Sequence, residues 1–169
     1  ILEPRFTCNI YLDKLQSITN VINDISAIFR GMIYWSNGYL FVSNDKFKEP
    51  IMLFNNSNVK DGTFNYSGSA RTGRHSAVLV RYNDKEDSFK PKAEYIEDTA
   101  AMREYGYLLK EIVALGTTSK SQAHRIGKWI LYTNQTETSL VQFSSGIEAS
   151  YLMPGDIIKI QDKLKSTKR

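Results

Sequence analysis

The hydrophobic pattern is most regular between residues 13 and 42, where a helical period gives way to a strand period. Apolar residues first recur at three- and four-residue steps, which is typical of one buried face of an α-helix. They are Leu15, Ile18, Ile22, Ile25 and Phe29, and Val21 and Ile28 widen the stripe. Asp13 and Gln16 have the spacing of a capping box, so we expect the helix to begin at Asp13.

A tight β-hairpin is expected directly after this helix. Gly31 stands where a helix often ends through a left-handed residue. Aromatic and β-branched residues at 32–35 and 39–42 then flank Ser36-Asn37-Gly38, and Asn-Gly is a strong hairpin signal. The simplest arrangement is a helix that packs on an antiparallel sheet.

The segment before the helix, residues 3–12, alternates between apolar and polar positions and predicts a half-buried strand. Cys8 lies on the apolar side of this predicted strand, so we interpret it as a small buried side chain. No neighbouring residue is of a kind that would lower the pKa of its thiol.

The rest of the chain alternates short strand patterns with turns. Strands are predicted at 51–54, 63–66, 75–82, 107–115, 138–143 and 157–160, with a polar loop at 85–92. Asp98 can cap a short helix that ends at Gly106. A second long helix is predicted from Ser119, which forms an S-x-x-Q capping box with Gln122, to about residue 134. Gly127 lies on its apolar face, where it would let another backbone approach closely.

About nine strands and two long helices in this order do not follow the strand-helix alternation of a parallel sheet. We therefore predict an α+β fold with a mainly antiparallel sheet or barrel and two long flanking helices. A single domain is expected over residues 1–162, followed by a basic tail or linker at 163–169.

Charge and composition narrow the function classes. The 169 residues carry a net charge of +4, and Lys163, Lys165, Lys168 and Arg169 supply that excess. We interpret this basic end as a solvated tail, because no basic stripe interleaved with aromatic residues marks a nucleic-acid surface. The single cysteine excludes an intramolecular disulfide. No apolar run approaches the length of a membrane span, so no membrane insertion is expected. The first residue is Ile1, which suggests a segment of a longer polypeptide.

Residues with catalytic or metal-binding chemistry are few. His75 and His124 have no partner at metal-ligand spacing, and residues 83–87, NDKED, lack the glycine and spacing of a calcium loop. Glycine, hydroxyl and arginine residues at 67–71 could form an anion nest, but a Walker lysine and a following helix are missing. We therefore predict no catalytic residue, no metal site and no cofactor.

Two alternative functions remain open at this point. Glu94, Glu97 and Asp98 could act as the acids of a cell-wall hydrolase, whose chemistry depends on the separation of two carboxylates. A nucleic-acid binder would instead use the basic tail, and its affinity would depend strongly on salt. Ten tyrosines and many asparagines are more typical of wet protein–protein contacts.

Five segments, in order and spacing, resemble the central region of the host-specificity protein J family of lambda-like siphophages, which are phage tail tip proteins. They are EPRFTCNIYL, VINDISAIFRGMIYWSNGYLFV, DGTFNYSGSARTGRHSAVLVRYND, AHRIGKWILYT and PGDIIKI. The resemblance covers nearly the whole chain. It implies a hub-like or tube-like fold similar to that of baseplate hub proteins, and a structural function without enzymatic activity.

The resemblance also implies partners and a location. Hub proteins of this kind assemble as trimers below the tail tube, contact other tail tip and tail tube proteins, and enclose the channel through which DNA passes as cargo. The receptor-binding part lies toward the C-terminus of the family, outside this segment. Such a protein is made in the bacterial cytoplasm and ends at the virion tail tip. For this chain we expect Ser67, Gly68, Arg71 and Arg74 to contact a neighbouring subunit or the channel.

Overall fold

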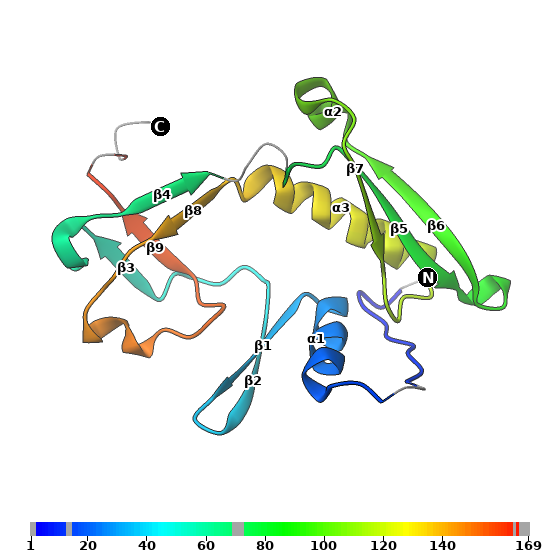
Figure 1. Ribbon diagram of the computed structural model, residues 1–169, viewed down its shortest axis with the longest axis horizontal. Coiled ribbons are helices and arrows are strands. Elements are labelled where there is room, and N and C mark those ends of the chain that lie inside the picture. Colours follow the sequence, from blue (N-terminus) through cyan, green and yellow to red (C-terminus); the bar gives the residue numbers. More distant parts are fainter. Residues whose placement is uncertain (1–2, 13–14, 69–72, 164, 166–169) are drawn as a thin grey trace. The chain divides into compact units, whose positions relative to one another are not determined.

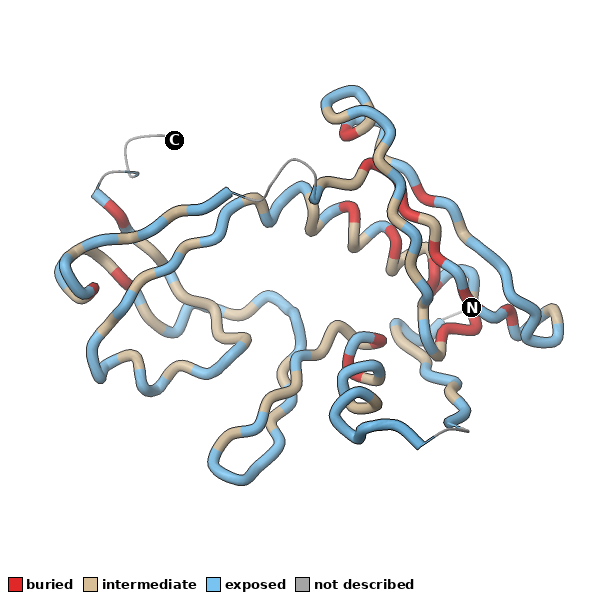
Figure 2. The backbone as a smooth tube through the Cα atoms, in the orientation of Figure 1, coloured by how far each residue is buried: buried red, intermediate tan, exposed pale blue. Residues whose placement is uncertain are grey.

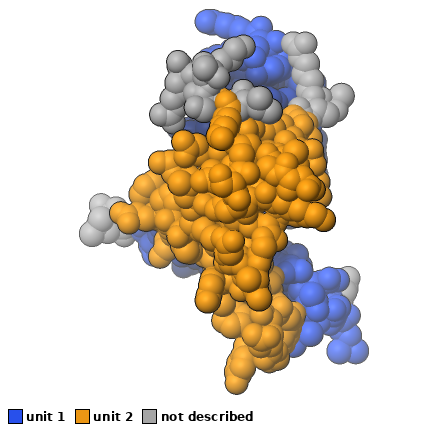
Figure 3. All heavy atoms as spheres, turned by 90° about the vertical axis from the view of Figure 1, so that its left-hand side faces the viewer, with its two compact units in different colours: residues 1–31, 69–138 blue, residues 32–68, 139–169 orange. Residues whose placement is uncertain are grey.

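The longest helix packs on a three-stranded sheet in the computed structural model of the chain (Figure 1). The structure describes residues 3–12, 15–68, 73–163 and 165. The chain divides into two compact units (Figure 3). Unit 1 comprises Ile1–Gly31 and Ser69–Thr138, and unit 2 comprises Met32–Gly68 and Ser139–Arg169. The single domain predicted over 1–162, with its separate tail, stays a prediction.

The sheet of unit 1 has the strand order β6-β5-β7. Its central strand is β5 (Ala77–Asp84), which pairs antiparallel with β6 (Lys90–Glu97) and parallel with β7 (Leu109–Val113). The residues from 90 onward continue the antiparallel ladder, so β6 begins inside the stretch that the sequence predicted as a loop.

A short helix lets the chain cross from one side of β5 to the other. Helix α2 (Thr99–Tyr105) begins with Asp98 as its N-cap and ends at Gly106, as predicted. The buried Ser76 hydroxyl donates to the Gly106 carbonyl at 2.8 Å and accepts from the Leu108 N–H at 2.8 Å. These bonds tie the crossing segment to the beginning of β5, which places β7 parallel to β5.

Helix α3 (Lys120–Thr136) covers one face of this sheet. Buried residues lie along β5 and on α3, where Figure 2 colours the backbone red. The core cluster consists of Val78, Val80, Tyr82, Ile96, Ala123 and Leu131. A Cβ atom at Gly127 would lie 2.5 Å from Ile96 Cδ1 and 3.2 Å from Val80 Cγ2. The close approach at Gly127 is present, but side chains of the sheet make it, and not the other backbone that the sequence had predicted.

Helix α1 (Ile18–Ile28) is shorter than predicted, and it is capped at Ser17. Leu15 and Ile18, which were expected in the buried stripe, are exposed, whereas Ser26 and Ile28 are buried. Asp13 lies outside the described residues. Ile28, which the sequence included in the stripe, faces the loop at Gly116, where a Cβ atom would lie 3.1 Å from Ile28 Cδ1.

The predicted strand at residues 3–12 is wrong, since no strand is assigned to this segment. Asn9 donates its N–H to the Gly116 carbonyl at 2.9 Å, and side chains supply the other contacts described below. Cys8 is exposed, so its expected burial is also wrong. Alternation alone could not show that this segment lacks a partner strand.

Unit 2 contains three two-stranded sheets. Strands β1 (Gly31–Ser36) and β2 (Tyr39–Asn44) form the predicted hairpin, with Asn37 and Gly38 at φ 50° and 80° in its turn. Strand β3 (Met52–Asn55) pairs parallel with β9 (Ile158–Gln161), and β4 (Asn65–Gly68) pairs antiparallel with β8 (Ser139–Gln142).

A cluster of aromatic rings lies at the β3–β9 and β4–β8 sheets. Phe54 is fully buried, and its ring centroid lies 4.8 Å from that of Phe143. The Phe143 ring also lies 5.2 Å from the ring of Phe64, in an edge-on arrangement. Edge-on and tilted aromatic pairs are favourable geometries. Unit 2 therefore has a compact but small core.

The α+β class is confirmed, but the finer predictions need correction. No sheet among the described residues closes into a barrel, and two of the strand pairs are parallel. Of the two helices expected to be long, α3 has 17 residues and α1 has 11. Parallel pairing joins segments far apart in sequence, so no local turn signal announces it. The hub-like or tube-like character of the fold stays a prediction.

Candidate functional site

The four residues predicted as subunit or channel contacts do not form one described site. Ser67 and Gly68 are exposed in β4 of unit 2, where they pair with Leu140 and Ser139 of β8. Arg71 lies outside the described residues. Arg74 belongs to unit 1. The contact role of these residues stays a prediction.

Arg74 is held by helix α2. Its guanidinium carbon lies 5.3 Å from the centre of the Tyr105 ring, and Nη1 donates to the Tyr105 hydroxyl at 3.3 Å. A cation over an aromatic face is stabilised by the ring quadrupole. Arg74 is thus partly engaged within its own chain.

The acids weighed for a hydrolase have separate structural roles. Glu94 and Glu97 are three residues apart in β6, so they lie on opposite faces of the strand. Glu97 accepts a hydrogen bond from the Tyr95 hydroxyl at 3.1 Å. Asp98 caps α2 by accepting from the N–H groups of Ala100 and Ala101 at 2.8 and 3.1 Å. The Ala101 bond, and then a bond from Gln135, hold the pKa of Asp98 below its ordinary value.

Glu94 contacts the histidine that the sequence singled out on α3. His124 Nδ1 lies 3.2 Å from Glu94 Oε1, and Lys120 Nζ lies 3.8 Å from Glu94 Oε2. His75 is elsewhere in unit 1, where burial and then the nearby Lys110 charge lower its pKa. Among the described residues, no group of three or more His, Cys, Asp or Glu side chains is arranged to hold a metal ion.

The NDKED segment forms a turn stabilised by its own side chains. Asp84 accepts from the Glu86 N–H at 3.0 Å and from Lys92 Nζ at 2.8 Å. The hydrogen bond from Lys92, followed by that from Glu86, lowers the pKa of the Asp84 carboxyl. These contacts agree with the interpretation of the segment as a turn.

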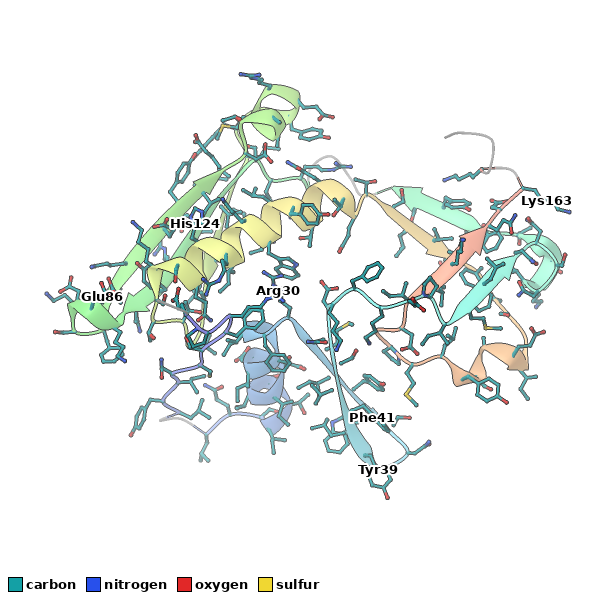
Figure 4. All side chains as sticks on the ribbon, turned by 180° about the vertical axis from the view of Figure 1, so that it is seen from behind. Arg30, Tyr39, Phe41, Glu86, His124 and Lys163 are labelled. Carbon is teal, nitrogen blue, oxygen red and sulfur yellow. The ribbon has the colours of Figure 1, made fainter. Side chains whose placement is uncertain are left out.

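A polar cleft of about 870 Å³ opens beside the first turns of α3 in unit 1. Figure 4 labels two of the residues that line it, His124 and Glu86. Acidic side chains of Glu3, Asp84, Glu86 and Glu94 alternate there with basic side chains of Lys85, Lys120 and Arg125. Five of these charged groups are paired with each other or with nearby polar side chains, namely Glu3, Asp84, Glu94, Lys120 and Arg125.

Glu3 lies at the N-terminal end of α3. Its carboxylate accepts from Ser119 Oγ at 2.7 Å and lies 2.5 Å from Ser121 Oγ. The Ser121 hydroxyl, then that of Ser119, lowers the pKa of Glu3. Ser119 therefore binds Glu3 and makes no side-chain capping bond to α3.

Gln122 is the residue that sequence reasoning placed wrongly. The capping box predicted that it bonds back to Ser119, but the structure shows it almost fully buried against the N-terminal segment. Gln122 Oε1 accepts from the Thr7 N–H at 3.1 Å, and Nε2 donates to the Thr7 carbonyl at 3.0 Å. The side-chain amide thus pairs with Thr7 as a neighbouring strand would.

The hairpin of unit 2 exposes large apolar side chains, including Met32, Trp35, Tyr39, Leu40 and Val42. Figure 4 labels Tyr39 and Phe41 in this hairpin. Exposed apolar clusters of this kind often mark protein–protein contacts. The sequence contains a sign of this apolar surface. Odd and even positions of residues 32–35 and 39–42 are all apolar or aromatic, which indicates burial on both faces of the hairpin.

Comparison with known proteins shows the family to which this chain belongs. Residues 17–169 match the family described as "Putative phage tail protein", and the chain belongs to that family. It is 33% identical over 165 residues to Tip attachment protein J of Escherichia phage SECphi27, covering 98% of this chain and 14% of that protein. It is 29% identical over 164 residues to Tip attachment protein J of Escherichia phage SECphi4, covering 95% and 14%.

These matches confirm the resemblance to the protein J family that the five sequence segments carry. The chain spans about 14% of the length of the curated relatives it matches. In the described part of the chain, no helix is both long and apolar enough to span a bilayer.

Proposed function

We propose that this chain is a structural segment of a phage tail tip protein, which assembles as a ring below the tail tube and takes part in host attachment and DNA delivery. The observation that carries the proposal is the 33% identity to a tip attachment protein over 98% of the chain. Similarity spread over a whole segment favours a shared fold and a shared place in the particle.

The proposal includes the partners of the complete protein. Three copies form the ring, which contacts other tail tip and tail tube proteins and lets DNA pass as cargo. Regions outside this segment bind the host receptor. The protein is synthesised in the bacterial cytoplasm and is built into the virion at the tail tip.

The segment acts without enzymatic activity in this proposal. Support comes from the acids weighed for a hydrolase: Glu94 and Glu97 lie on opposite faces of β6, and Asp98 serves as a helix cap. General acid–base cleavage of a glycan needs two carboxyl groups on either side of one bond. These three residues do not offer such a pair.

The test is to locate the protein in the particle. An antibody against this segment, coupled to gold, is bound to purified phage particles and viewed by electron microscopy. Gold at the tail tip is the expected result, and an antibody against a capsid protein is the control for labelling. If opened particles stay unlabelled while the lysate contains the free protein, the structural proposal is wrong and the cell-wall hydrolase moves to first place.

A further inference from the structure

The hairpin of β1 and β2 has two apolar faces, and they have different surroundings. Tyr34 and Phe41 belong to the first face, because their rings stack with centroids 5.5 Å apart. Side chains alternate along a strand, so the neighbouring positions point to the second face. This second face, named the open face below, consists of Ile33, Trp35, Leu40 and Val42.

The first face is covered at its base within unit 2. A Cβ atom at Gly155 would lie 2.8 Å from both Met32 Cε and Ser43 Oγ, so the turn at Gly155 presses against this face. Lys48 Nζ donates to Ser43 Oγ at 3.1 Å and to the Gly155 carbonyl at 3.4 Å. These contacts hold the base of the hairpin in place.

Among the described residues the open face shows no comparable contact: Ile33 is half-buried, and the other three side chains are exposed. Trp35 is 64% exposed, Val42 is 58% exposed and Leu40 is 38% exposed. An isolated two-stranded hairpin is only marginally stable in water, and a hydrophobic face needs a packing partner. The Asn37-Gly38 turn fixes the hairpin geometry in advance, so little ordering is required when a partner covers this face.

The chemistry of the hairpin favours one kind of partner. Residues 31–44 contain no charged side chain, and the tip, Ser36-Asn37-Gly38, is polar. Segments that bind a membrane surface typically carry basic residues beside their apolar side chains, and this hairpin has none. A separate charged partner would be steered by opposite charges, which are absent here.

A second copy of the same chain meets these conditions. In a symmetric assembly, residues near the axis face their own equivalents, so an uncharged apolar surface can pack on itself without like-charge repulsion. Four side chains are far fewer than the about 20–30 residues a side of a stable interface. The contact therefore suits copies that the rest of a long protein already holds together.

We propose that the open face packs against the open face of neighbouring copies at the symmetry axis of the tail tip assembly. This inference rests on the proposed function, since it needs several copies in one ring. It adds the surface through which these copies meet.

The experiment uses the complete protein in phage particles. Val42→Cys and, separately, Trp35→Cys place a thiol on the open face, and Val113→Cys is the matched control on β7, where the valine is 74% exposed. Particles are treated with a short bismaleimide, denatured and separated by gel electrophoresis. Unsubstituted particles receive the same treatment, which shows any linkage through native cysteines.

For Val42→Cys and Trp35→Cys we expect a band of twice the subunit mass, at least tenfold stronger than in Val113→Cys. Mass spectrometry should identify a link between the same position in two copies. Linkage to a different protein, or dimer at the control level for both variants, overturns the inference. Gold labelling separates the two proposals: gold at the tip without this linkage rejects the open-face contact alone, whereas missing gold rejects the proposed function.

Discussion

The two units are stabilised in different ways. Of the buried apolar side chains among the described residues, only Phe54 and Val59 belong to unit 2, and the other nine belong to unit 1. Unit 1 has one helix packed on one sheet, with strands that alternate between buried and exposed positions. Among its described residues, unit 2 has two two-stranded sheets, β3–β9 and β4–β8, with an aromatic cluster, and the β1–β2 hairpin with an open apolar face.

This difference indicates where the chain depends on other molecules. A sheet covered by a helix buries its apolar face internally, whereas two-stranded sheets leave edges and faces available for other chains. Unit 1 is therefore suited to act as the scaffold, and unit 2 is suited to make contacts. The substitutions below test this comparison in the 169-residue chain by denaturant unfolding.

The largest effect is expected in the aromatic cluster of unit 2. Phe54→Ala should lower the free energy of unfolding by about 3–5 kcal/mol, because it leaves a cavity between rings that nothing else fills. Phe47, which is 93% exposed, supplies the control. Phe47→Ala should change stability by less than about 0.5 kcal/mol. Equal effects for the two variants would show that the cluster does not form a core.

In unit 1, the next largest effect is expected where Gln122 pairs with Thr7. Gln122→Ala removes the side-chain amide that bonds both the N–H and the carbonyl of Thr7. It should lower the free energy of unfolding by about 2–3 kcal/mol. Amide hydrogen exchange should become faster at Thr7, with less change in β5. Gln142, an exposed residue of β8, is the control, and Gln142→Ala should have little effect. Unchanged protection at Thr7 would contradict the pairing.

The hairpin, helix α2 and Gln122 show which features the sequence could and could not predict. The hairpin was predicted because Asn-Gly and its flanking residues act locally. The α2 helix was predicted for the same reason, from Asp98 and Gly106. Gln122 was not, because its partner Thr7 lies 115 residues earlier and the nearby Ser119 offered a plausible local bond.

The same limit applies to sheet topology and to the candidate site. Parallel pairing of β3 with β9 joins Met52 to Ile158, and no short-range pattern connects these positions. The open face of the hairpin was readable as apolar residues on both parities of residues 32–35 and 39–42. Its exposure could not be read from them, because exposure depends on which other segments cover the hairpin.

A smaller effect is expected at the contact between α3 and the sheet. Gly127→Ala gains about 1 kcal/mol of helix propensity, but its Cβ atom would meet Ile96 Cδ1 at 2.5 Å. Overpacking of this kind should leave a net loss of about 1–2 kcal/mol. Ile96→Val removes the Cδ1 atom, so the double variant should recover part of the loss. Simple additivity of the two single changes would contradict the close packing.

The smallest effect concerns the N-cap of α2 and depends on pH. Because hydrogen bonds from Ala101 and then Gln135 lower the pKa of Asp98 in the folded chain, its ionised form contributes stability above the ordinary pKa of aspartate. That contribution is lost as the pH falls from about 4 through the lower folded pKa. Asp98→Ala should cost about 1 kcal/mol at neutral pH. Asp98→Asn keeps a capping side chain, so it should retain most of the stability and flatten the acid dependence. If the acid dependence of stability is unchanged in Asp98→Asn, it comes from other carboxyl groups with lowered pKa values. Glu3 and Asp84 are candidates in the same unit.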